Sequence, residues 1–267
     1  MRSNVTALHI EPRFETDTCD QHGEYRAQVS TILGREFRSN CPECSAAKKA
    51  EEAAAEREQQ ARAEQAALAR RIGSALIPKR FADRDFDSYR AEQPGQARAL
   101  AKCREYAQQF ADHLKAGRCL ILAGKPGTGK THLATAIAGH LVRNTRYVPL
   151  YRTVSGILQY VKGSYDSRAE YTEAEAFDAL ARPHLLIIDE VGATKPTEFE
   201  LATMFSVVNS RYEQQLPTVI ITNLALSELG QAMGERCVDR LREGGGIALV
   251  FDWQSARVFR EEGFDRG

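Results

Sequence analysis

Residues 119–131 read Cys-Leu-Ile-Leu-Ala-Gly-Lys-Pro-Gly-Thr-Gly-Lys-Thr, an apolar run that leads directly into the pattern G-x4-G-K-T. The residues that follow, His-Leu-Ala-Thr-Ala-Ile-Ala-Gly-His at 132–140, include three alanines and favour a helix. A strand, a glycine-rich loop and a helix in this order are the context that a phosphate-binding P-loop requires. This stretch therefore predicts a nucleotide-binding α/β domain.

Each position of the loop has a physical task. Glycines allow the backbone N–H groups to approach and wrap a phosphate, and the helix that begins near Lys130 directs its positive dipole end at the same anion. Lys130 is expected to contact the β- and γ-phosphates, and the Thr131 hydroxyl to contact Mg2+. The residues predicted to bind ATP are Gly124, Pro126, Gly127, Thr128, Gly129, Lys130, Thr131 and, from a later strand, Asp189.

Short apolar runs alternate with helical segments through the rest of residues 77–258, which predicts parallel strands with helices on both faces of the sheet. One run, Leu185–Ile188, ends in Asp189 and Glu190. Asp189 is expected to hold Mg2+, and Glu190 to polarise the water that attacks the γ-phosphate. The next run, 218–221, ends in Thr222 and Asn223, so Asn223 is a candidate to contact the γ-phosphate or that water; a turn-forming role is the alternative.

Three arginines follow in residues 234–242, Gly-Glu-Arg-Cys-Val-Asp-Arg-Leu-Arg. Arg236 and Arg240 are four residues apart and share one helix face. Either can stabilise the transition state at the nucleotide of a neighbouring subunit as an arginine finger. The alternative is a structural role in which the arginines pair with neighbouring acidic residues.

The amino-terminal residues contain a second candidate site. Cys19, His22, Cys41 and Cys44 form the pattern C-x2-H-x18-C-x2-C, which predicts a structural zinc site, with a redox pair or idle thiols as the alternative. Four protein ligands leave no open position for catalysis. Between the two pairs a short hairpin is expected, with apolar material from Tyr25, Val29, Ile32, Leu33 and Phe37.

The composition sets the remaining limits. The 267 residues carry 36 basic and 36 acidic side chains, and this neutrality argues against a protein that coats nucleic acid through bulk charge. Neither a membrane span nor a secretory signal is recognisable, so a cytoplasmic protein is expected. Helix-forming residues dominate 45–72. We therefore predict a zinc-ribbon-like module (1–44), an Ala-rich helical linker (45–76) and an ATPase domain (77–267).

These motifs resemble the AAA+ ATPases of the bacterial replicative-helicase loader (DnaC) and transposition-helper (IstB) clade. Further matches are Phe86-Asp-Ser-Tyr89, the Gly95-Gln stretch, and Phe251-Asp-Trp253-x-Ser255. The resemblance covers roughly 180 residues. It implies that Asn223 is sensor 1, that Arg240 or else Arg236 is the finger, and that Arg257 is a sensor-2-like residue. It further implies a P-loop AAA+ core without a full carboxyl-terminal lid, whereas the amino-terminal module departs from the better-known loaders.

The resemblance also implies partners. A stretch at 147–171 with Arg152, Lys162 and several tyrosines is similar to a helix that lines the DNA channel in initiators and loaders, and aromatic faces among basic residues suit single-stranded DNA. The alternative is an amphipathic helix whose tyrosines pack inward. The leading hypothesis is an ATP-dependent homo-oligomer that loads a hexameric, DnaB-like replicative helicase onto single-stranded DNA. A transposition helper that recruits a transposase is the alternative, and a small-molecule kinase or an adaptor that barely hydrolyses ATP represents other classes.

Overall fold

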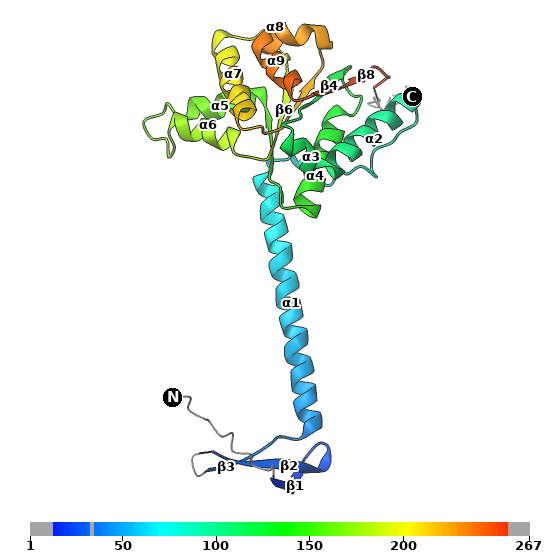
Figure 1. Ribbon diagram of the computed structural model, residues 1–267, viewed down its shortest axis with the longest axis vertical. Helices are drawn as coiled ribbons and strands as arrows, with labels where there is room; N and C mark the ends of the chain where they lie inside the picture. The colour runs from blue at the N-terminus through cyan, green and yellow to red at the C-terminus, as the bar shows by residue number, and fades with distance from the viewer. Residues whose placement is uncertain (1–12, 33–34, 256–267) are drawn as a thin grey trace, which may run out of the picture. The chain divides into compact units, whose positions relative to one another are not determined.

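The computed structural model describes residues 13–32 and 35–255 of the chain (Figure 1). The chain divides after Ala66 into two compact units, which are described separately below. None of the helices in the described part has the combination of length and apolar character needed to cross a lipid bilayer.

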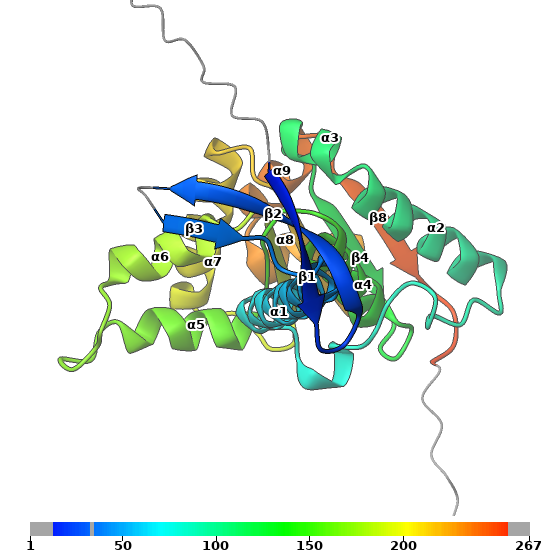
Figure 2. The same ribbon diagram turned by 90° about the horizontal axis from the view of Figure 1, so that it is seen from below.

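The first unit contains a three-stranded antiparallel sheet in the order β1-β2-β3 (Figure 2). Its strands are β1 (Arg13–Cys19), β2 (Gly23–Ile32) and β3 (Arg35–Arg38). Ala27 and Val29 are buried on one face, whereas Ile32 and Phe37 are 57% and 53% exposed. The hairpin is therefore confirmed, but Ile32 and Phe37 do not supply its apolar packing, because strand alternation turns them to the solvent face. Leu33 lies outside the described residues.

The long helix α1 (Pro42–Ser74) follows this sheet and confirms the helix expected from residue 45 to residue 72. None of its residues is buried, and i,i+4 ion pairs such as Arg62–Glu58 lie along its surface. The carboxyl-terminal end of α1, from Ala67 onward, belongs to the second unit. There Arg71 fixes the end of the helix by donating hydrogen bonds to the carbonyl oxygens of Thr145 and Tyr147.

The second unit is built on a five-stranded parallel sheet in the order β5-β6-β7-β4-β8. The strands are β4 (Leu120–Gly124), β5 (Pro149–Thr153), β6 (Leu185–Val191), β7 (Thr218–Thr222) and β8 (Ile247–Phe251). The helical elements are η1 (Lys79–Phe81), α2 (Pro94–Gln108), α3 (Phe110–Lys115), α4 (Lys130–Asn144), α5 (Val154–Gly163), α6 (Glu173–Ala181), α7 (Glu198–Glu213), η2 (Leu226–Glu228), α8 (Leu229–Met233) and α9 (Glu235–Glu243). The predicted α/β class is confirmed.

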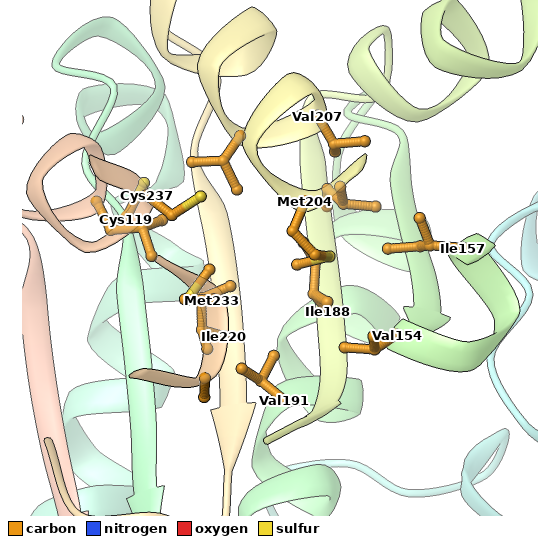
Figure 3. Close-up of a cluster of buried hydrophobic side chains, with 14 of the residues drawn as sticks. Cys119, Val154, Ile157, Ile188, Val191, Met204, Val207, Ile220, Met233 and Cys237 are labelled. Carbon is orange, nitrogen blue, oxygen red and sulfur yellow. The ribbon is translucent and has the colours of Figure 1, made fainter. Parts of the chain in front are cut away.

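Alternate residues of β4, β5, β6 and β7 face two separate hydrophobic clusters, whereas the edge strand β8 joins only one of them and exposes Val250 on its other face. In β4, Ile121 joins the cluster made with α5 to α9, part of which Figure 3 shows, and Leu122 joins the cluster made with α2, α3 and α4. A strand buried on both faces needs a continuous apolar run, which β4 and the first four residues of β6 have. Because β7 lies between β4 and β6, the loops after these three strands meet at the carboxyl edge of the sheet.

The buried side chain of Arg211 stabilises the amino edge of the sheet, opposite the edge at which the P-loop lies. The Arg211 side chain is fully buried and donates hydrogen bonds to the carbonyl oxygens of Ala181, Pro183 and Pro217 and to the Thr218 hydroxyl. Burial lowers the pKa of Arg211 to about 9, so the guanidinium still carries its proton at neutral pH. These bonds hold the chain where it enters β6 and β7.

Candidate functional site

The P-loop lies between β4 and the start of α4. Gly129 precedes the helix with a φ of 95°, and α4 begins at Lys130. The Lys130 side chain is 5% exposed, and its Nζ donates hydrogen bonds to the carbonyl oxygens of Gly124 (2.7 Å) and Lys125 (2.6 Å). The lysine is therefore positioned above the loop, beside the positive end of a 15-residue helix.

Two glycines of the loop cannot be replaced without displacing other atoms. A Cβ at Gly124, where φ is 131°, would lie 2.2 Å from the Phe251 carbonyl oxygen. A Cβ at Gly129 would lie 2.5 Å from Cε2 of Tyr89. Both positions also have φ values that L side chains rarely adopt, so the sequence needs glycine there for conformation and for space.

The loop is braced by residues from the two ends of the domain. The Tyr89 hydroxyl (3.2 Å) and Trp253 Nε1 (3.0 Å) both donate hydrogen bonds to the Thr128 carbonyl oxygen. Burial raises the pKa of Tyr89 to about 12, which keeps its hydroxyl protonated as a donor. The flanking motifs in the sequence therefore have a local physical role, which the sequence alone did not reveal.

Asp189 connects three elements at the carboxyl edge of the sheet. Its Oδ2 accepts hydrogen bonds from the Thr131 hydroxyl of α4 (2.9 Å) and the Tyr151 hydroxyl of β5 (2.7 Å), and its Oδ1 accepts one from the Glu190 amide (2.7 Å). Burial, and then the charge of Asp189, raise the pKa of Tyr151 well above its ordinary value, so Tyr151 remains a proton donor. Sequence reasoning paired Thr131 with Asp189 through a metal but missed this role of Tyr151.

Glu190 has an unusual backbone conformation. Its φ is 64°, and the pairing of β6 with β7 shifts register between Ile188 and Val191. For a residue with a side chain this left-handed conformation costs about 1–2 kcal/mol. The resulting irregularity exposes Glu190, which lines the same cleft as Asn223 at the end of β7. The structure thus places Lys130, Asp189, Glu190 and Asn223 around one cleft.

This cleft has a volume of about 590 Å3 and is lined by the P-loop and both strand ends. Residues before α2 and in its first turn complete it, and sequence reasoning did not assign them to the cleft: Arg80, Phe81, Arg84, Ser88, Arg90 and Gln96. The sequence did contain a signal for this part of the cleft: Arg80, Arg84 and Arg90 fall within eleven residues, around the Phe86-to-Tyr89 motif. A polar cleft with a lysine, hydroxyls and carboxylates around a P-loop fits a nucleoside triphosphate with its metal ion.

The candidate arginines lie away from this cleft. Arg236 is exposed on α9, and the Arg240 guanidinium packs over the Tyr212 ring (4.3 Å) and pairs with Glu243 (3.3 Å). Neither lines the cleft of its own chain. Arg257 lies outside the described residues.

In the stretch considered for DNA binding, residues 147–171, most aromatic rings pack against other side chains of the same unit. The Tyr160 ring is contacted by Arg152 (5.0 Å) and stacks on Tyr171 (4.8 Å), and Lys162 Nζ lies 5.1 Å from the Phe199 ring centroid. Of Tyr147, Tyr151, Tyr160 and Tyr165, only Tyr165 is exposed. This arrangement matches the alternative in which the tyrosines pack inward.

The four predicted metal ligands converge in the first unit. The ligand atoms of Cys19, His22, Cys41 and Cys44 all lie within 4.8 Å of one another. Sγ of Cys19 lies 3.5 Å from Sγ of Cys44, and His22 Nδ1 lies 3.3–3.7 Å from the three sulfur atoms. Bond lengths of about 2.3 Å to sulfur and 2.05 Å to nitrogen give tetrahedral edges of roughly 3.6–3.8 Å, so the cluster fits zinc.

The surroundings of the cluster support the same chemistry. Hydrogen bonds from the Gln21 backbone and from His22 lower the pKa of Cys19 to about 6, which favours the thiolate that metals bind. The hydrogen bond between the Cys19 and Cys44 thiols has the opposite effect on Cys44, whose pKa it raises to about 11, so in the absence of a cation only one thiol of this pair ionises near neutral pH. Nε2 of His22 lies 3.4 Å from a Glu43 carboxylate oxygen, the partner that orients many metal-binding imidazoles.

Comparisons with known proteins agree with this geometry. Residues 43–241 match the family model described as IstB-like ATP binding protein. The replicative helicase loader DnaC of Escherichia coli K12 is 34% identical over 172 residues, which cover 64% of this chain and 68% of the relative. The DnaC of Buchnera aphidicola from Acyrthosiphon pisum is 31% identical over 192 residues, covering 72% and 76%.

Solved structures share the fold. A crystal structure of the DnaC helicase loader aligns with a TM-score of 0.59 at 22% identity, covering 65% of this chain and 99% of that one. A crystal structure of DnaI aligns with a TM-score of 0.55 at 21% identity, covering 66% and 94%. The family match and the DnaC relatives, together with the cleft, identify an ATPase with an AAA+ core.

Proposed function

The chain belongs to the IstB-like ATP-binding protein family, and from this premise we propose that it is an ATP-driven loader of a replicative helicase. Several copies of the chain assemble when ATP is bound, and the assembly binds a hexameric replicative DNA helicase. The assembly then helps deliver the helicase onto single-stranded DNA in the cytoplasm. The observation that carries the proposal is the similarity to two DnaC loaders, at 31% identity over 192 residues and 34% identity over 172 residues. Hydrolysis is the step that releases the loader.

We propose that the P-loop and Asp189 bind ATP and its metal. Lys130 and the loop amides contact the phosphates, because both lie at the positive end of α4. Thr131 and Asp189 would hold Mg2+, which their adjacent oxygen atoms suit. When bound, Mg2+ neutralises charge on the β- and γ-phosphates. Tyr151 orients the Asp189 carboxylate.

Glu190 and Asn223 serve hydrolysis in this proposal. The exposed Glu190 carboxylate accepts a proton from the attacking water, and Asn223 orients that water or the γ-phosphate. Arg240 or Arg236 acts on the nucleotide of a neighbouring copy, since both lie away from the cleft of their own chain. We also propose Arg257 as a sensor-2-like residue, a role that rests on the family resemblance alone.

The second candidate function is that of a transposition helper that binds DNA and recruits a transposase. The family match favours this function, because the family model is described by its likeness to IstB, the transposition helper. The two functions share the ATPase chemistry and differ in the partner.

The partner distinguishes these two functions directly. We expect the tagged chain to retain the replicative helicase of its source organism in the presence of Mg2+ and ATP, and Lys130→Ala to retain at least about tenfold less, because the P-loop lysine secures the nucleotide. Co-purification from matched lysates, quantified by mass spectrometry, measures both. Retention of a transposase without the helicase would contradict the loader proposal.

Glu190→Gln tests the hydrolytic role. Loss of the carboxylate should lower ATP turnover at least about 100-fold while ATP binding persists, because general-base catalysis contributes 10²–10⁴-fold. Phosphate release and fluorescent-ATP titration measure the two properties. Glu198→Gln, an exposed carboxylate outside the cleft, serves as the control. Equal turnover in wild type and Glu190→Gln would remove Glu190 from the mechanism.

Mixing variants tests the arginine finger. Loss of the finger arginine should lower turnover at least about 100-fold. Glu190→Gln chains bind ATP without hydrolysing it and keep their arginines. Adding them to the finger variant should therefore restore ATP turnover at the intact sites of the finger variant. Arg240→Ala and Arg236→Ala are compared, with Arg242→Ala as the control. If neither variant regains activity in the mixture, these arginines do not act between subunits.

We propose zinc as the structural metal of the Cys/His cluster, held by Cys19, His22, Cys41 and Cys44. Elemental analysis should find one zinc ion per chain and almost none in Cys41→Ser, because three ligands hold the ion far more weakly than four. Removal by a strong chelator should unfold the small sheet, whose described part buries few apolar side chains. Absence of stoichiometric zinc from freshly purified protein would refute this assignment.

A further inference from the structure

The small sheet of the first unit has one face that is open to solvent. Strand register places Phe14, Arg26, Ile32, Arg35 and Phe37 on this face, which we call the aromatic face. Phe14 is 48% exposed, Phe37 53% and Ile32 57%. Exposed large apolar side chains are few in the rest of the described chain, so three on one short sheet mark an interaction surface.

The charges differ between the two faces of this sheet. On the opposite face, Arg13 pairs with Glu15 and Glu36, and Arg38 pairs with Glu15 and Asp17. On the aromatic face, Arg26 and Arg35 have no ion pair with a described carboxylate. Glu24 also lies on this face, opposite Thr18 at the end of the hairpin. The aromatic face therefore presents two unneutralised guanidinium groups beside its phenylalanines.

The arrangement of these groups suits nucleic acid. The Arg26 guanidinium lies 5.1 Å from the Phe14 ring centroid, so a base that stacks on the remaining exposed surface of Phe14 would bring its phosphate close to a cation. Phe14 and Phe37 are on the two strands that flank β2, opposite Gln28 and Ser30. Their Cα positions are thus two strand spacings apart across the sheet and two residues apart along it, which is roughly 12 Å. Sheets that bind single strands use two or three such aromatic platforms with basic side chains around them.

We propose that the aromatic face binds single-stranded DNA, with bases stacked on Phe14 and Phe37 and phosphates held by Arg26 and Arg35. The choice of DNA over RNA rests on the proposed loader function. The contact itself requires neither the nucleotide cleft nor a helicase. It adds a DNA-binding surface outside the ATPase core, where the tyrosines of residues 147–171 mostly pack internally.

The test is binding of fluorescein-labelled oligothymidine to the full chain without nucleotide, followed by fluorescence anisotropy. Phe14→Leu/Phe37→Leu keeps apolar side chains but removes the aromatic rings, and should weaken binding at least about tenfold. Arg26→Gln should weaken binding several-fold, whereas Arg38→Gln, which removes the same charge from the opposite face, should leave the Kd within about twofold. Zinc content and circular dichroism verify that each variant is folded.

Several results would overturn the proposal. Undetectable binding by the wild-type chain, equal losses in Arg26→Gln and Arg38→Gln, or undiminished binding by the double leucine variant would each exclude this surface. Tighter binding of oligouridine would exclude DNA as its ligand. If the double leucine variant loses helicase in co-purification but binds oligothymidine normally, the face is a protein-docking surface. Because the oligothymidine titration contains neither helicase nor ATP, its failure is separate from failure of the loader function.

Discussion

The Asp189 carboxylate is the constraint on which the rest of the ATPase unit depends. It accepts hydrogen bonds from α4, from β5 and from the amide of the next residue, Glu190. These bonds connect the P-loop helix to two strands of the sheet, although Thr131 and Asp189 are 58 residues apart. A polar group with 6% exposure is stable only when its hydrogen bonds are made, so this carboxylate holds the loop and both strand ends in fixed positions.

Most of the ATPase unit could be predicted because its signals are local. The P-loop and the apolar strand runs each fall within a few residues, and their order implies a parallel sheet. The brace on Thr128 could not be predicted from spacing, because Trp253 is 125 residues from its acceptor. The role of Tyr151 was missed for the same reason: a tyrosine in a strand is ordinarily core, and only the fold brings its hydroxyl to Asp189.

The amino-terminal unit shows the opposite pattern. The convergence of Cys19, His22, Cys41 and Cys44 was predictable from two short spacings, whereas the packing of the hairpin was not. Ile32 and Phe37 read as core residues by composition, yet the register places them opposite Arg35 and Ser30 on the solvent face. In a sheet this small the metal cluster can replace a second apolar layer, which leaves one face free for a ligand. The exposed Phe14 and Phe37 therefore contribute little to the packing of this sheet and are available for the proposed contact.

The central claim is that ATP drives this chain to place a ring helicase on DNA. The most direct measurement uses closed circular single-stranded DNA, which has no end over which a ring can thread. Helicase bound to the circles is separated by gel filtration and counted with and without the chain. The account predicts several-fold more helicase on the circles when wild-type chain and ATP are present, and no such gain with Lys130→Ala. Helicase binding that is no greater with the chain than without it would contradict the account.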